Sequence, residues 1–174
     1  MKKFAAIALT ATVFLAACGT DETSDTKEAT ADSGVSETDK DVKQELMKFY
    51  MAIPNTINAV DGDLNLFEMG QAEGTLPEGE ELQTMKDAAI LSAENAADAV
   101  ETLEIPTALE GQQEQIETAF TAIMESYEMK AEALAKDASF EAADKKFGEA
   151  DALLNELLVE QDLAPSSVYN EVSQ

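Results

Sequence analysis

The sequence predicts an all-α protein, namely an antiparallel, up-down-up-down bundle of four helices that follows a disordered acidic tether. Three observations lead to this prediction. Apolar residues recur every three or four positions in four successive stretches, which is the spacing of one face of a helix. Helix-breaking or helix-capping residues separate these stretches, and the only run with strand-like composition lies in the leader. Short connections between long helices favour antiparallel neighbours.

The first stretch runs from residue 42 to residue 67 and is expected to form one long helix. Its apolar positions are Val42, Leu46, Phe49, Ile53, Ile57, Val60, Leu64 and Phe67. Pro54 lies in the middle of this stretch and removes one backbone donor, so a kink is predicted there. Because the freed carbonyl near Tyr50 needs a partner, the kink is also the expected place for a small polar pocket.

Three further apolar stripes, over residues 82–103, 109–134 and 140–157, predict the second, third and fourth helices. The second apolar stripe comprises Leu82, Met85, Ala89, Ala93, Ala96, Val100 and Leu103; the third comprises Leu109, Ile116, Phe120, Ile123, Tyr127 and Leu134; the fourth comprises Phe140, Ala143, Phe147, Ala150, Leu154 and Leu157. Alanine is frequent on the second and fourth stripes, so these two helices are expected to approach their neighbours closely.

The residues between the stripes predict where the helices end and begin. Residues 70–79 contain three glycines and a proline and separate the first helix from the second. The second helix should end at Ile105-Pro106, because a residue before proline is pushed out of the helical region. The pattern Thr-x-x-Glu at residues 107–110 resembles a capping box that opens the third helix. Asp137 or Ser139 is the expected N-cap of the fourth.

The composition excludes several kinds of chemistry. The 174 residues carry 36 acidic and 11 basic side chains, which gives a formal charge of −25, and every basic residue is lysine. The absence of histidine excludes Ser-His-Asp and Cys-His nucleophiles and imidazole zinc ligands. The absence of arginine removes the bidentate clamp for phosphate and carboxylate. The strong negative charge argues against nucleic acid as a partner. We therefore expect no enzymatic activity, no cofactor and no metal site.

The N-terminus has the organisation of a secretory leader. Met1-Lys2-Lys3 is a positive segment, and residues 4–17 are apolar apart from two threonines, which is too short to span a membrane. The apolar run ends in Leu15-Ala16-Ala17-Cys18, which resembles the lipobox of bacterial lipoproteins. The resemblance implies cleavage before Cys18 and attachment of a diacylglyceryl group to its sulfur. The alternative is an ordinary signal peptide that leaves Cys18 as a free thiol.

The segment after the lipobox is predicted to be a disordered tether. Its only large apolar residue is Val35, and seven of its side chains are acidic, so it cannot bury enough apolar surface to offset its ordering entropy. The predicted organisation is therefore a lipoprotein signal peptide (1–17), a lipidated cysteine with an acidic linker (18–40), a four-helix bundle (41–163) and a loosely held C-terminal tail (164–174).

The segment Asp61-Gly62-Asp63-Leu64-Asn65 has the opening pattern of an EF-hand calcium loop. The pattern fails where glycine, an apolar residue and glutamate should follow, because Leu66, Glu68 and Ala72 occupy those positions. The apolar stripe also runs through the segment, so a helix loosened by Gly62 is the expected structure.

Other polar side chains are expected to have structural roles. No acidic residue falls on an apolar stripe, so the carboxylates are expected on solvated faces. Five polar residues lie on or beside the stripes and could orient a ligand, bond helix backbone or fix the register: Asn55, Asn58, Ser92, Asn95 and Ser126. Core filling is the expected role of the methionines near the stripes, which are Met47, Met51, Met85, Met124 and Met129.

These features together predict a lipoprotein anchored on the extracytoplasmic face of the cell membrane through a diacylglyceryl group on Cys18. The leader followed by a small acidic helical domain resembles short lipoproteins of Gram-positive bacteria. The predicted function is a non-enzymatic binding or scaffolding module that acts on an envelope protein or ligand. The alternative is a module that binds a small ligand or a divalent cation such as calcium. Removal of the leader discards two lysines, so the exported side chains carry 9 − 36 = −27.

Overall fold

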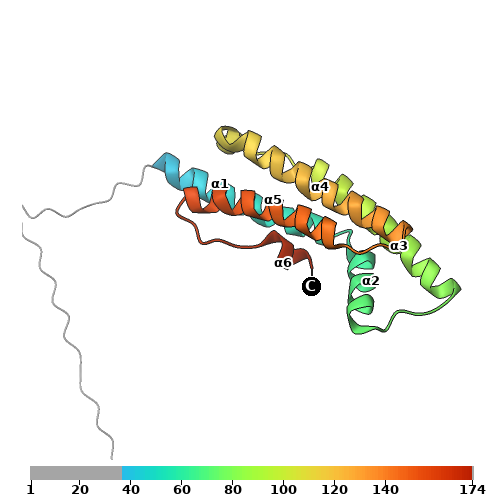
Figure 1. Ribbon diagram of the computed structural model, residues 1–174. Helices are drawn as coiled ribbons and strands as arrows, with labels where there is room; N and C mark the ends of the chain where they lie inside the picture. Colours follow the sequence, from blue (N-terminus) through green and yellow to red (C-terminus); the bar gives the residue numbers. More distant parts are fainter. Residues whose placement is uncertain (1–36, 174) are drawn as a thin grey trace, which may run out of the picture. The chain divides into compact units, whose positions relative to one another are not determined.

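The computed structural model describes residues 37–173, and its side chains from residue 41. These residues form only helices and turns, which confirms the all-α prediction (Figure 1). The elements are α1 (Glu37–Asn58), α2 (Gly62–Glu73), α3 (Glu80–Glu101), the 3₁₀ helix η1 (Thr107–Gln112), α4 (Gln113–Ala135), α5 (Glu141–Glu160) and α6 (Val168–Val172). The predicted leader, the lipobox and residues 18–36 of the predicted linker lie outside the described residues.

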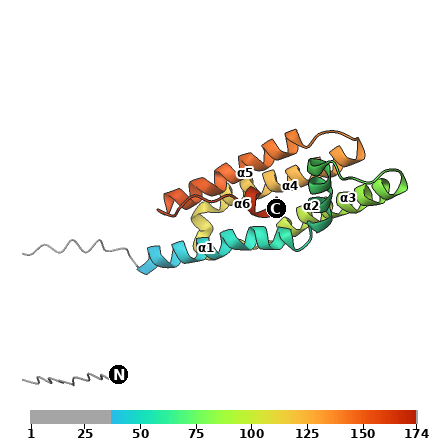
Figure 2. The ribbon, with the colours of Figure 1, turned by 90° about the horizontal axis from the view of Figure 1, so that it is seen from below.

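The four long helices α1, α3, α4 and α5 lie alongside one another, and α2 is steeply inclined to them (Figures 1 and 2). Helix α4 packs against both α3 and α5, whereas α1 packs against α3, η1 and α6. The alanine stripe of α3 is completely buried at Ala89, Ala93 and Ala96, as expected of small residues that let helices approach closely. No described helix is both long enough and apolar enough to serve as a membrane span.

The first predicted helix is divided into two beside Gly62, where the sequence predicted a helix that is loosened but continuous. Helix α1 continues through Pro54 and ends at Asn58, and α2 begins at Gly62. Helix α3 stabilises this break, because the buried hydroxyl of Ser92 donates to the Val60 carbonyl (2.8 Å) and accepts from the Leu64 amide (3.2 Å). A tertiary hydrogen bond therefore replaces the helical bond expected across this position.

The predicted caps of the third and fourth helices are also corrected. Thr107 begins the 3₁₀ helix η1 after Pro106 and makes no side-chain cap, and α4 starts six residues later at Gln113. The N-cap of α5 is Phe140 rather than Asp137 or Ser139. Asp137 instead takes a left-handed conformation (φ 54°) in the turn that follows α4.

The C-terminal segment is not held loosely, contrary to the prediction. Helix α6 lies between α1 and α5 (Figure 2), with Val168 fully buried and Val172 3% exposed. The Val168 amide donates to Asp151 Oδ1 (2.7 Å) on α5, and the Asn58 side chain of α1 donates to the Glu171 carbonyl (3.1 Å). Burial of these two valines therefore offsets the entropic cost of ordering this segment, which is too short to show a helical stripe.

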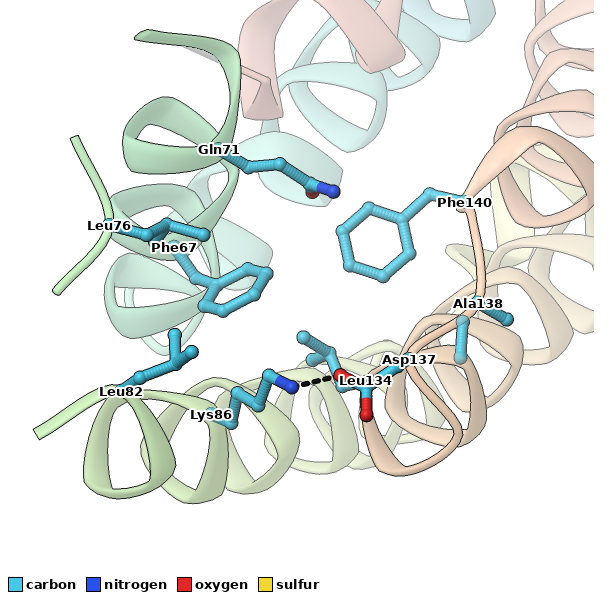
Figure 3. Close-up of a pocket in the computed structure, with 10 residues that line it drawn as sticks. Phe67, Gln71, Leu76, Leu82, Lys86, Leu134, Asp137, Ala138 and Phe140 are labelled. Atoms are coloured by element: carbon cyan, nitrogen blue, oxygen red, sulfur yellow. Dashed lines mark hydrogen bonds and ion pairs between the residues drawn. The ribbon is translucent and has the colours of Figure 1, made fainter. Parts of the chain in front are cut away.

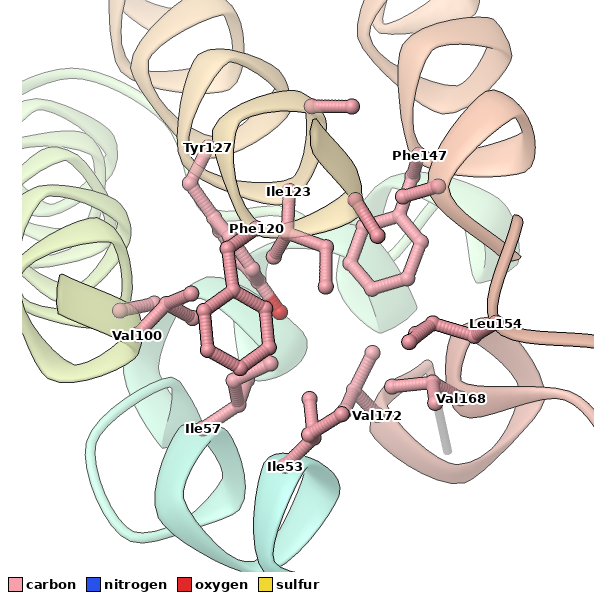
Figure 4. Close-up of a cluster of buried hydrophobic side chains, with 14 of the residues drawn as sticks. Ile53, Ile57, Val100, Phe120, Ile123, Tyr127, Phe147, Leu154, Val168 and Val172 are labelled. Atoms are coloured by element: carbon pink, nitrogen blue, oxygen red, sulfur yellow. The ribbon is translucent and has the colours of Figure 1, made fainter. Parts of the chain in front are cut away.

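A continuous apolar core joins these helices (Figure 4). Its central side chains come from α1, α3, α4, α5 and α6 and include Ile53, Ile57, Val100, Phe120, Ile123, Tyr127, Phe147, Leu154, Val168 and Val172. Phe147 contacts two tyrosine rings edge-on, Tyr127 at 6.0 Å and Tyr169 at 5.3 Å between centroids. The expectation that methionines fill the core is wrong for Met47, Met51 and Met129, which are 41%, 47% and 37% exposed.

Candidate functional site

A cavity of about 230 Å³ lies where the turn between α2 and α3 meets the turn between α4 and α5 (Figure 3). Its walls are mostly apolar and include one pair of opposite charges and one amide. The lining residues are Phe67, Gln71, Leu76, Leu82, Lys86, Ala133, Leu134, Asp137, Ala138 and Phe140. The rings of Phe67 and Phe140 are tilted against each other, with their centroids 6.5 Å apart. We call this cavity the end pocket.

A glycine on α2 shapes one wall of the end pocket. A Cβ added at Gly70 would lie 2.9 Å from Cδ2 of Leu76, so a larger residue there would require the end of the Leu76 side chain to shift. Gly74 supplies the left-handed residue (φ 67°) that ends α2, and its amide donates to the Gln71 carbonyl. The turn therefore places Leu76 against α2, where it lines the pocket.

The end pocket is bordered by an ion pair that joins two elements far apart in the sequence. The Lys86 ammonium on α3 bonds Oδ1 of Asp137 in the turn after α4. The Lys86 side chain is 17% exposed, whereas that of Asp137 is 77% exposed. Figure 3 shows the Gln71 amide reaching toward the space from the opposite side. The pocket thus combines an apolar body with one half-buried cation, one solvated anion and one amide.

A second group of charges, in which only the lysine is buried, joins α2, α4 and α5. Lys130 is 4% exposed, and its ammonium lies 2.6 Å from Glu68 Oε1 and 3.5 Å from Asp144 Oδ1. The same nitrogen lies 5.6 Å from the ring centroid of Phe140 and 6.0 Å from that of Tyr169. Two carboxylates and two aromatic faces therefore compensate the buried cation. We call Lys130, Glu68 and Asp144 the ion cluster.

Asp61 lies in the break between α1 and α2 and is 1% exposed, which corrects the expectation that every carboxylate is solvated. Its Oδ2 atom has no hydrogen-bond partner among the described residues. Burial raises the pKa of Asp61 to about 6, against the opposing effects of a hydrogen bond from Asn65 and the charge of Lys130. Asp61 therefore changes its charge at a pH near neutrality.

Two tyrosine hydroxyls beside these charges are held in their protonated form. Burial, followed by the negative charges of Asp61 and Glu68, raises the pKa of Tyr127 well above its usual range. Burial and the charge of Asp144 raise the pKa of Tyr169 to about 12. At neutral pH both groups consequently act as neutral hydroxyls, and Tyr127 is hydrogen-bonded to Asp61.

The segment that resembles an EF-hand opening does not form a loop. Gly62–Glu73 is helical, and the Asn65 amide donates to the Asp61 carbonyl (3.0 Å). Asp61 and Asn65 instead border a shallow cavity of about 530 Å³ with Asn58 and Glu171. No group of three or more potential metal ligands of the His, Cys, Asp or Glu type occurs among residues 37–173.

The remaining sequence-predicted polar residues divide between the core and the surface. Ser92 and Ser126 are buried and bond backbone, since the Ser126 hydroxyl donates to the Ala143 carbonyl (2.8 Å). Asn55 and Asn95 are exposed. Pro54 is buried, and the two cavities described above lie elsewhere. The serines thus fix helix register, which was one of the roles that the sequence left open.

The apolar stripes held a signal for the buried charges. The third stripe skips from Tyr127 to Leu134, and Lys130 occupies the inward position three residues after Tyr127. Asp61 follows Ile57 by four residues and precedes Leu64 by three, so it shares the spacing of the first stripe, and the prediction that no acidic residue falls on a stripe is wrong for Asp61. A charged residue at a stripe position predicts a buried, paired charge. The end pocket had no such signal, because its lining comes from three helices and two turns that are far apart in the sequence.

Comparison of the chain with known protein families, with curated proteins and with solved structures finds no match in any of the three.

Proposed function

We propose that this chain is a lipoprotein anchored on the extracytoplasmic face of the cell membrane, with a helical domain that is a non-enzymatic binding module. The observation that carries the proposal is Leu15-Ala16-Ala17-Cys18 at the end of an apolar run of secretory length. A diacylglyceryl group on Cys18 would supply two acyl chains, and two chains give stable anchoring where one gives marginal binding.

In this proposal the four long helices form an up-down-up-down bundle that the acidic linker separates from the bilayer. The packing of α4 against both α3 and α5 supports this arrangement. The exported side chains carry 9 − 36 = −27, so an anionic membrane surface repels the domain. The lipid must therefore hold the protein at the membrane, and the charge keeps the domain away from the bilayer.

The end pocket supports a binding role for the helical domain. It offers apolar walls for the body of a ligand and an ion pair with an amide for its polar part, which is the usual construction of small-molecule sites. The whole sequence has neither histidine nor arginine, so the commonest general base and the bidentate anion clamp are both missing. A binding function without catalysis is therefore the function that these residue types support best.

Calcium binding is the second candidate, and Asp61 is the observation that favours it. Its Oδ2 has no hydrogen-bond partner among the described residues, and Asp61 lines one cavity with Asn58, Asn65 and Glu171, whose side-chain oxygens are of the type that calcium prefers. Calorimetric titration with calcium should then give a dissociation constant in the millimolar range, and Asp61→Asn should abolish this binding. A flat isotherm for the wild-type chain removes this candidate.

The lipid anchor is tested by cell fractionation and mass spectrometry. The wild-type chain should appear in the membrane fraction with its mature N-terminal peptide carrying a diacylglyceryl group on Cys18. The Cys18→Ala chain should lose that modification and appear in the medium. The matched control is Ser24→Ala, a small substitution in the same segment that leaves the lipobox intact. An unmodified wild-type chain in the medium would refute the proposal.

A further inference from the structure

We propose that the end pocket binds a free amino acid with an apolar side chain. The side chain would occupy the apolar cavity, the carboxylate would bond Lys86, and the ammonium would bond Asp137. This inference deepens the binding role proposed above and rests on it. It is carried by the size of the pocket, the nature of the charges at its border, and the charge of the whole chain.

The size of the pocket suits a small apolar side chain. A dry cavity of about 150 Å³ holds a benzene molecule, which has six heavy atoms. By the same proportion, the 230 Å³ of the end pocket accommodate about nine heavy atoms, which is the size of free leucine. Leu76, Leu82 and Leu134 present branched aliphatic groups to this space, and a branched aliphatic ligand matches them in shape and polarity.

The ion pair at the border suits a head that carries both charges. A ligand carboxylate that replaced Asp137 on Lys86 would leave the aspartate without its partner, unless the ligand also brought a cation. The α-amino acid head holds an ammonium and a carboxylate a few ångströms apart, so it can be inserted between the two side chains and leave neither unpaired. The Asp137 side chain is 77% exposed, so its displacement from Lys86 costs little.

The charge of the whole chain selects between the possible ligands. An anion of the same shape must approach a chain of net charge −25, which repels it at long range. A cation is attracted by the chain but meets the half-buried ammonium of Lys86 at the pocket. A zwitterion has no net charge and is not repelled, and each of its groups meets the opposite charge. The structure therefore favours a zwitterion over either ion.

The test is calorimetric titration of the full exported chain, purified with its lipid in detergent, against L-leucine. We expect a saturable isotherm with a dissociation constant between about 10 μM and 1 mM, the range of a nine-atom ligand. Isocaproate lacks the ammonium, isoamylamine lacks the carboxylate, and glycine lacks the side chain, so each should bind at least about tenfold more weakly. The absence of saturable leucine binding, or equal binding of isocaproate, would overturn the proposal.

Two pairs of variants locate the site. Lys86→Gln should weaken leucine binding at least about tenfold, whereas Lys136→Gln, which removes an exposed lysine that follows α4 and pairs with Glu132, should leave it unchanged. Ala138→Trp fills the pocket from an exposed position and should abolish binding, whereas Ala135→Trp at an exposed position outside the lining should not. Wild-type affinity in Lys86→Gln or in Ala138→Trp refutes the assignment.

The same preparation separates this inference from the function on which it rests. Mass spectrometry of the titrated sample reports the lipid on Cys18, and that result does not depend on leucine. A lipidated chain that binds no leucine overturns the amino-acid site and leaves the lipid anchor standing. A chain without lipid that binds leucine overturns the anchor and leaves the site standing.

Discussion

Replacement of Asp61 by asparagine should change the dependence of stability on pH in a way that reports its burial. The carboxyl group is 1% exposed in the break between α1 and α2, and its Oδ2 has no hydrogen-bond partner among the described residues. Asparagine has nearly the same shape and keeps an oxygen that can accept from Tyr127, but it carries no charge at any pH. The substitution therefore removes the titration while it retains most of the packing.

The magnitude follows from the raised pKa. The pKa of Asp61 is 3.8 in an unstructured chain and about 6 in the folded protein. A folded-state pKa above the unfolded value means that the contribution to stability is complete below pH 3.8 and is lost as pH rises through 6. The difference of about two pKa units corresponds to about 3 kcal/mol. Ionised Asp61 therefore lowers the free energy of unfolding at pH 7 by about that amount.

Asparagine recovers part of this free energy. Its amide nitrogen takes the place of an atom without a partner, and a buried donor without an acceptor costs about 1–2 kcal/mol. At pH 7, Asp61→Asn should therefore be more stable than the wild-type chain by about 1–2 kcal/mol. Below pH 4 the wild-type carboxyl group is neutral, and the variant should be less stable by about the same amount. The two stability curves should cross near pH 5.

The assay is urea unfolding followed by far-ultraviolet circular dichroism between pH 3.5 and pH 7.5. Other carboxylates titrate equally in both chains, so the difference between the two free energies isolates Asp61. Asp63→Asn is the matched control, because Asp63 is exposed in the first turn of α2. That substitution should destabilise by about 0.3–1 kcal/mol at pH 7 through the helix dipole. A constant difference between wild type and Asp61→Asn across this range would refute the reasoning.

Three further substitutions test the packing. Lys130→Met leaves the ion cluster without its cation and should lower the free energy of unfolding at pH 7, measured by urea titration, by about 2–4 kcal/mol. Addition of Glu68→Gln to the Lys130→Met chain should restore part of that stability. A further loss of stability in the double variant would contradict the pairing of Lys130 with Glu68. Ser92→Ala should cost about 1–3 kcal/mol and speed amide hydrogen exchange at the start of α2; unchanged exchange would count against its role in the break. Val168→Ala should cost about 1.5–3 kcal/mol, whereas Val159→Ala, at a side chain 58% exposed, should cost under about 0.5 kcal/mol. Equal effects of the two valine substitutions would show that α6 is not docked.

The helices were predictable from sequence because apolar spacing records burial directly. The second, third and fourth stripes correspond to α3, α4 and α5, and the all-α class followed from them. The same rule failed between α1 and α2, where the stripe continues through Val60 and Leu64 although the helix stops. The stop depends on the hydroxyl of Ser92, about thirty residues further along the chain, and periodicity within one segment cannot register such a bond.

Helix α6 was missed because it is too short for a periodic pattern to be distinctive. Only Val168 and Val172 mark its buried face, although Ser167 is a good N-cap and accepts from the Asn170 amide at 3.1 Å. Its helical structure depends on its packing against α1 and α5 rather than on its own helix propensity. The end pocket was missed for a related reason, since Lys86 and Asp137 are 51 residues apart in the sequence.

Substitutions of Lys130 and Lys86 should have different effects, because Lys130 contributes mainly to stability and Lys86 to the proposed ligand site. Phe140 is shared by both environments, because its ring lies 5.6 Å from the Lys130 ammonium and also lines the end pocket. Loss of Lys130 should therefore disturb the pocket through Phe140, and weaker leucine binding in Lys130→Met would not by itself locate the ligand. Lys86 pairs with a solvated aspartate instead, so its loss costs little stability. Of the two lysine substitutions, Lys86→Gln should therefore keep the urea midpoint and lose leucine binding, whereas Lys130→Met should lower the midpoint, and this contrast distinguishes a ligand contact from a structural ion pair.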